Sequence, residues 1–227
     1  MQKSIFLVCF ILLSILNHAQ TYEIEYESSY NGKVQADQPK TVTWVSETEN
    51  YILNTNIKNQ KTEFPFEISK IEKPSNTIIS YGFLNQNKIV STSDAESIAK
   101  QEFEVTSETK KILGYSCKKA VTKINSNTIE VWYTNDLKLK GGPSSLGQNL
   151  GLVLQIERNG NSATTAVSVK KIKKTGIEKI INKEPSISDL LSYRDLLWRS
   201  KFTTIKVFEN ETINFSEESK SNDSIKR

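Results

Sequence analysis

Hydrophobic and polar residues alternate along most of the chain between residues 21 and 173. Such alternation is typical of β-strands that bury one face, because successive side chains of a strand point to opposite sides. Residues 21–27 show it most clearly, since Tyr22, Ile24 and Tyr26 share one face and Glu23 lies on the other. Ten further strands are predicted over residues 41–45, 51–55, 61–71, 77–83, 88–92, 102–108, 115–124, 128–134, 152–158 and 163–173. Strands at this close spacing predict a mainly β fold, of α+β class, around one large antiparallel sheet.

Turn signals and one helical pattern complete the outline. Asn159-Gly160 is the clearest turn, and it predicts that the strands on either side of it pair antiparallel. Residues 185–201 place leucines and aromatic residues at helical spacing, which predicts an amphipathic helix packed on a sheet face. The alternative is a membrane-surface helix, which the mixed charges of its polar face disfavour. Residues 208–227 are polar, and a disordered tail is expected there.

The strand pattern is interrupted by residues 141–156, the most glycine-dense and least charged part of the chain after its leader. Gly141, Gly142 and Pro143 require a turn, because glycine allows positive φ and proline lacks an N–H. Residues 150–156 are apolar and predict a buried strand entered through Gly151. The sequence therefore predicts a glycine- and serine-rich loop beside an apolar strand, an arrangement suited to the lid of a hydrophobic cavity.

Three motifs in this region resemble the GLPGLI family of uncharacterised envelope proteins. Residues 111–120 resemble its Ile-x-Gly-Tyr-x-Cys-x-Lys-Ala strand, and residues 131–134 resemble its Trp-Tyr-Thr strand. Residues 142–154 resemble its Gly-Pro pair and namesake motif, although Gln-Asn-Leu at 148–150 replaces Gly-Leu-Pro, so the chain is an atypical member. The resemblance implies a curved antiparallel sheet related to lipoprotein-carrier folds.

The N-terminus predicts the cellular compartment. Residues 1–19 have the basic, apolar and small-residue parts of a secretory signal peptide, with cleavage expected before Gln20. The alternative, an uncleaved anchor, is disfavoured because the apolar stretch is too short to span a bilayer. We therefore expect a periplasmic or secreted protein without a transmembrane segment, with one sheet domain over residues 20–207.

Composition narrows the possible chemistry. His18, the single histidine, lies in the predicted leader, so the mature chain has no imidazole for catalysis, metal binding or pH sensing. After cleavage 29 basic residues face 26 acidic ones, and this mild, unclustered excess does not indicate a nucleic-acid partner. We expect no enzyme, no cofactor and no metal site, and the carboxylates at 94, 96, 102 and 104 are expected to be solvated. Cys117, the one mature cysteine, is either a buried structural residue or a reactive thiol.

These expectations lead to a hypothesis about function. The leading interpretation is a non-enzymatic envelope protein that binds a hydrophobic small molecule or lipid, and the alternative is a protein–protein assembly module that contacts an outer-membrane protein. A third interpretation is an enzyme that uses Cys117. Aromatic residues such as Trp132 either line the ligand cavity or fill the core. The candidate ligand-binding residues are Gly142, Pro143, Leu146, Gly151, Leu152, Leu154 and Trp132.

Overall fold

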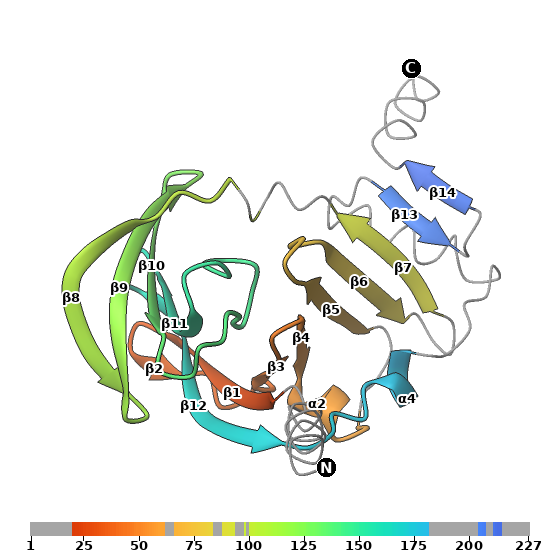
Figure 1. Ribbon diagram of the computed structural model, residues 1–227, viewed down its shortest axis with the longest axis horizontal. Coiled ribbons are helices and arrows are strands. Elements are labelled where there is room, and N and C mark those ends of the chain that lie inside the picture. Colours follow the sequence, from red (N-terminus) through yellow and green to blue (C-terminus); the bar gives the residue numbers. More distant parts are fainter. Residues whose placement is uncertain are drawn as a thin grey trace, which may run out of the picture.

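The computed structural model describes residues 20–61, 66–83, 88–93, 98, 100–181, 204–207 and 211–214, and the side chains of 88–93, 204–207 and 211–214 are not described. Its strands form one open, strongly curved sheet (Figure 1). Every pairing between its strands is antiparallel. The predicted mainly β, curved antiparallel fold is thus confirmed.

Eleven of the strands described correspond to predicted ranges, and three short ones, at 33–34, 204–207 and 211–214, were not predicted. In chain order they are β1 (Thr21–Tyr30), β2 (Lys33–Val34), β3 (Thr41–Val45), β4 (Glu49–Asn54), β5 (Phe66–Glu72), β6 (Ile78–Phe83), β7 (Lys88–Ser93), β8 (Glu104–Ile112), β9 (Tyr115–Ile124), β10 (Asn127–Thr134), β11 (Leu152–Arg158), β12 (Ser162–Ile172), β13 (Thr204–Val207) and β14 (Glu211–Asn214). Their order in the sheet is β14-β13-β7-β6-β5-β4-β3-β1-β12-β11-β10-β9-β8, with β2 beside β1. The hairpin across Asn159-Gly160 joins β11 to β12 as predicted.

Strand β1 lies in the middle of the sheet, between β3 and β12. Ile24 and Tyr26 are fully buried on one of its faces, as the alternation predicts. The opposite face is less solvated than the pattern suggests, because Glu23 is only 9% exposed. In the register between β1 and β3, Glu23 lies opposite Trp44 and Glu25 lies opposite Val42, so these four side chains share that second face.

Two buried clusters lie on the two faces of β3. The first, which we call the inner cluster, lies on the face of Val45 and contains Ile24, Tyr26, Val45, Ile112, Cys117, Trp132, Leu139, Leu152, Leu154 and Ala166. The second, the outer cluster, lies on the face of Trp44 and contains Val42, Trp44, Tyr51, Leu53, Ile57, Ile68, Phe83 and Ile177. Since side chains of a strand alternate, β3 separates the two clusters.

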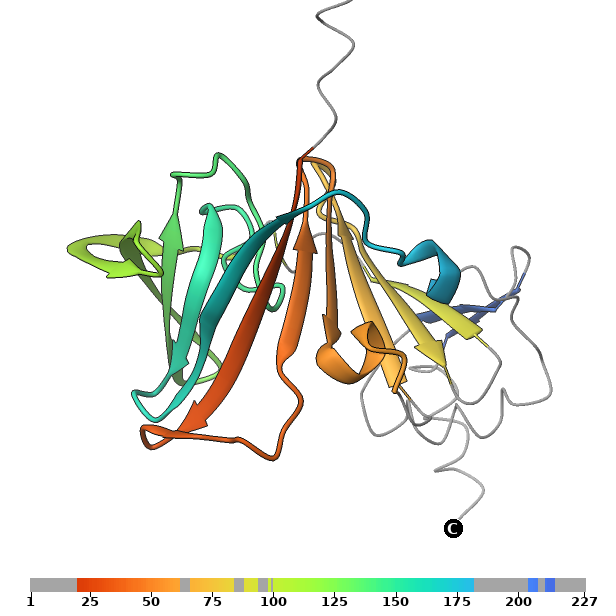
Figure 2. The same ribbon diagram turned by 90° about the horizontal axis from the view of Figure 1, so that it is seen from below.

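Two short helices cover the outer cluster, and the sequence pattern predicted neither. They are α2 (Thr55–Lys58), which the Asn54 side chain caps, and α4 (Glu178–Ile181), and they lie near one another in both views (Figures 1 and 2). The predicted signal peptide and the predicted helix at 185–201 lie outside the described residues. Strand β14 lies within the segment predicted to be a disordered tail. None of the helices described is long and apolar enough to cross a membrane.

An ionic network holds α2 against β1. Lys58 Nζ lies 2.7 Å from Glu23 Oε1 and 2.7 Å from Glu25 Oε1. The Trp44 indole N–H donates to the other oxygen of Glu23 at 2.9 Å. The hydrogen bond from Lys58 lowers the pKa of Glu25. Burial alone would lower the pKa of Lys58, but its bonds to both carboxylates raise it overall, so Lys58 and Glu25 are both ionised at neutral pH.

This network predicts a pH-dependent stability difference. We expect Lys58→Met to lower the free energy of unfolding by about 1–2 kcal/mol at pH 7, because it leaves two half-buried carboxylates unpaired. A carboxyl group whose folded pKa is depressed stabilises the fold above its unfolded pKa and loses that contribution as pH falls through the folded value. The difference between the variant and the parent protein should therefore shrink below pH 4.5, the ordinary value for glutamate. Urea unfolding of both proteins at neutral and acidic pH measures it, and a constant difference would contradict the assignment.

Candidate functional site

The connection between β10 and β11, residues 135–151, folds back against the inner side of the sheet (Figure 1). Its second part, from Gly141 to Gly151, forms a loop that is closed at its base. Gly141 N–H donates to the Gly151 carbonyl at 3.1 Å, and Val153 N–H donates to the Gly141 carbonyl at 2.8 Å. Two glycines allow this close approach. A Cβ on Gly142 would lie 2.7 Å from Val153 Cβ, and one on Gly151 would lie 2.7 Å from the Thr134 carbonyl oxygen.

Side-chain amides, two of them buried, hold this loop against the rest of the protein. Asn50, which is fully buried on β4, donates to the Gly142 carbonyl at 3.0 Å and to Gln148 Oε1 at 3.4 Å. Gln148 is 2% exposed and donates to the Ser144 carbonyl. Gln101 accepts from Gly147 N–H at 3.0 Å and donates to the Ser145 carbonyl at 3.2 Å. The loop predicted as a lid is therefore attached to the rest of the protein at several points.

A pocket of about 210 Å³ lies between this loop and the sheet, and we call it the loop pocket. The register of the β11–β12 hairpin builds one wall, because Ile156 lies opposite Thr164 and Arg158 lies opposite Ser162. The residues that line the pocket are Thr41, Pro143, Ser144, Leu146, Ile156, Arg158, Ser162 and Thr164. Of the predicted ligand-binding residues, Pro143 and Leu146 thus line the pocket.

The loop pocket combines polar donors with an apolar surface. Within the part of the chain described, the side chains of Thr41, Arg158, Ser162 and Thr164 have no hydrogen-bond or ion-pair partner. They supply three hydroxyl groups and one guanidinium, and Arg158 is exposed. Pro143, Leu146 and Ile156 supply apolar contact. Such a mixture suits a small polar ligand that has hydroxyl or amide groups and a nonpolar side.

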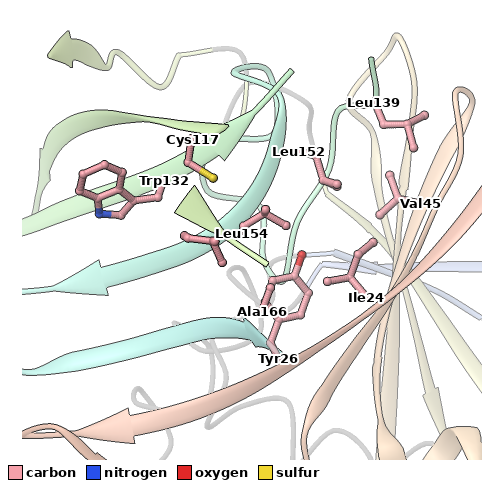
Figure 3. Close-up of a cluster of buried hydrophobic side chains, with 10 residues drawn as sticks. Ile24, Tyr26, Val45, Cys117, Trp132, Leu139, Leu152, Leu154 and Ala166 are labelled. Atoms are coloured by element: carbon pink, nitrogen blue, oxygen red, sulfur yellow. The ribbon is translucent and has the colours of Figure 1, made fainter. Parts of the chain in front are cut away.

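The other predicted ligand-binding residues lie elsewhere or have structural contacts. Gly142 and Gly151 are buried at the base of the loop, and Leu152 and Leu154 are fully buried in the inner cluster (Figure 3). Trp132 belongs to the same cluster, and its ring is covered by Lys110, whose Nζ lies 4.0 Å from the ring centroid. Sequence reasoning missed Arg158, Thr41, Ser162 and Thr164. The predicted Asn159-Gly160 turn contained a signal for two of them, since a hairpin there brings the end of β11 beside the start of β12, where Arg158 lies opposite Ser162.

The residues that the structure describes contain neither a metal site nor an exposed thiol. Among them, no group of three or more histidine, cysteine or acidic side chains is arranged to hold a metal ion. Cys117 is 1% exposed, and burial raises the pKa of its thiol, so little thiolate forms at neutral pH. Glu102 and Glu104 are exposed, and the other members of the acidic cluster lie outside the described residues.

Comparison with known proteins relates this architecture to a family. The family profile described as "N-glycanase peptide, N-terminal domain" (PNGase F-II) matches residues 24–195. A structure of PNGF-II in space group C2 superposes with a TM-score of 0.71 and 52% sequence identity, over 87% of this chain and 36% of that one. A second structure of PNGF-II, in space group P2₁, superposes with a TM-score of 0.71 and 50% sequence identity, over 87% of this chain and 37% of that one. This chain thus spans little more than a third of PNGF-II. No curated protein matches.

These matches correct two predictions from the sequence. The resemblance to the GLPGLI family was wrong, because the profile match covers all three of the motifs that suggested it and much of the chain on either side. The functions inferred with it, lipid binding and assembly at the outer membrane, were wrong for the same reason, since the family is related to N-glycanases.

Proposed function

This chain belongs to the family of N-glycanase N-terminal domains, and from that premise we propose that it recognises N-glycosylated polypeptides without cleaving them. The ligand is the saccharide nearest the asparagine, bound in the loop pocket. The observation that carries the proposal is the unpartnered set of hydroxyl and guanidinium groups in that pocket, on a chain 52% identical to PNGF-II over 87% of its length.

The chemistry of the pocket supports a sugar ligand. Sugars present hydroxyl and acetamide groups, which hydrogen-bond to arginine, serine and threonine side chains. They also present patches of C–H groups, which pack on apolar side chains such as Pro143, Leu146 and Ile156. Because the loop is fastened by Asn50, Gln101 and Gln148, little ordering is needed on binding.

We propose binding without hydrolysis because of the residues available to this chain. The predicted mature chain has no histidine, and its one thiol, Cys117, is buried. The loop pocket contains no carboxylate for general acid–base catalysis. The leader-like residues 1–19 further support a secreted protein.

Calorimetric titration with a glycopeptide tests this function. The ligand is a short peptide with chitobiose on one asparagine, and the reference ligand is the same peptide without sugar. We expect only the glycopeptide to bind, and Arg158→Ala to weaken its affinity by about tenfold, because one hydrogen bond to a charged group is lost. Lys171→Ala removes an exposed positive charge outside the pocket and should leave the affinity unchanged.

Two results would contradict the proposal. One is equal binding of the glycosylated and bare peptides, which would place recognition on the polypeptide. The other is release of the sugar by the chain alone, detected by mass spectrometry as conversion of the glycosylated asparagine to aspartate, which would make the chain itself a hydrolase.

A further inference from the structure

A second hollow lies on the outer side of the sheet, between α2 and the segment that leads into α4. It has a volume of about 330 Å³. Its polar lining comes from Trp44, Lys58, Gln60, Lys174, Thr175 and Lys179. We call it the lysine cleft. The loop pocket includes Thr41, and alternation along β3 places Thr41 and Trp44 on opposite faces of the sheet, so the two hollows are separate.

Lys58 is fixed at one side of this cleft by the ionic network described above. Its ammonium has three N–H groups, and two of them are directed to Glu23 and Glu25 at 2.7 Å. Glu23 is held from a second direction, since it also accepts from the Trp44 indole. The network therefore orients Lys58 and leaves one of its N–H groups available to a ligand.

Lys174 and Lys179 supply the uncompensated charge. Both are exposed residues that line the cleft, and neither has an ion-pair partner among the residues that the structure describes. The surroundings are also basic, because residues 170–179 contain five lysines and one glutamate. Gln60 and Thr175 add an amide and a hydroxyl group, which are neutral donors. This set of donors matches a compact, multiply charged oxyanion.

We propose that the lysine cleft binds a sulfate or phosphate group, either free or esterified to a sugar. The anion lies between Lys174 and Lys179 and accepts from Lys58 and Gln60, while the rest of the cleft has room for the attached sugar ring. This site is distinct from the loop pocket and does not depend on binding there. It would give the module a preference for polysaccharides or glycans that carry acidic substituents.

Calorimetry with four defined probes tests the site and distinguishes its possible ligands. The probes are sodium sulfate, sodium phosphate, N-acetylglucosamine 6-sulfate and unsubstituted N-acetylglucosamine. We expect the ionic probes to bind in the cleft. The neutral sugar should bind only in the loop pocket, so replacing Lys174 and Lys179 should leave its binding unchanged. Tighter binding of the sulfated sugar than of free sulfate identifies an esterified ligand, and equal binding identifies the free anion.

Matched double variants separate a built site from general charge attraction. Lys174→Gln with Lys179→Gln removes two charges from the cleft and should weaken sulfate binding by about a hundredfold, or tenfold for each lysine. Lys171→Gln with Lys173→Gln removes two exposed charges from the same segment outside the cleft and should change binding less than about twofold. All four lysines are exposed, so we expect both double variants to fold, and circular dichroism checks this. Equal weakening by both pairs, or no binding of any ionic probe to the parent protein, would overturn the proposal.

Discussion

Replacing Gly142 by alanine is expected to lower the free energy of unfolding by about 3 kcal/mol. The added Cβ would lie 2.7 Å from Val153 Cβ, well inside van der Waals contact. Val153 cannot easily move away, because it is fully buried and its N–H bonds to the Gly141 carbonyl at 2.8 Å. The loop must shift instead, which strains the hydrogen bond from Asn50 to the Gly142 carbonyl. Urea denaturation of the parent and variant proteins measures the difference.

Gly160→Ala is the control for this experiment. A Cβ at Gly160 meets its nearest atom, Glu157 Oε1, at 3.9 Å, so only the positive φ of 68° opposes the substitution. The cost of that backbone conformation is about 1 kcal/mol. If Gly142→Ala costs no more than Gly160→Ala, the loop is not packed against β11 as described.

Replacing Leu154 by alanine is expected to destabilise the protein by about 3–4 kcal/mol. Leu154 is fully buried in the inner cluster, among side chains from β1, β9, β10 and β12 (Figure 3). Its removal leaves a cavity that the surrounding strands cannot close, because they are fixed by hydrogen bonds to their neighbours. The expected loss is measured by chemical unfolding, with binding of the glycopeptide measured on the fraction that stays folded.

Val105→Ala provides the matched control, since Val105 is an aliphatic residue on β8 that is 51% exposed. It should cost no more than about 0.5 kcal/mol, because surface substitutions away from special features have small effects. A small effect of Leu154→Ala, combined with altered ligand binding, would contradict its role as a core residue and would return it to the set of ligand-binding residues.

The sheet could be predicted from the sequence because each strand carries its own local pattern. Strands β3, β9 and β11 have the predicted bounds, and the Asn159-Gly160 turn gave the β11–β12 pairing. Helix α2 could not be predicted, since its four residues are too few for a helical periodicity. Glu23 was expected to be solvated because alternation does not show that a helix and Lys58 cover that face.

The candidate site depends on contacts between distant segments, which single-strand patterns do not contain. Thr41 and Leu146 line one pocket although they are far apart in the sequence. In the sequence, Gln148 was noted only as a departure from the GLPGLI motif. In the structure it is buried and donates a hydrogen bond to the Ser144 carbonyl of its own loop. The resemblance to the GLPGLI family failed for a related reason. Its motifs describe two strands and a glycine-proline connection, features that a sheet protein of another family also has.

The most direct test of the central claim is an amide chemical-shift titration of the isotope-labelled protein with the chitobiose-bearing glycopeptide. We expect the glycopeptide to shift the amide signals of Ser144, Leu146, Arg158, Ser162 and Thr164 most strongly, and the bare peptide to leave those signals unshifted. Shifts confined to another surface, or the same shifts with the bare peptide, would contradict glycan recognition in the loop pocket.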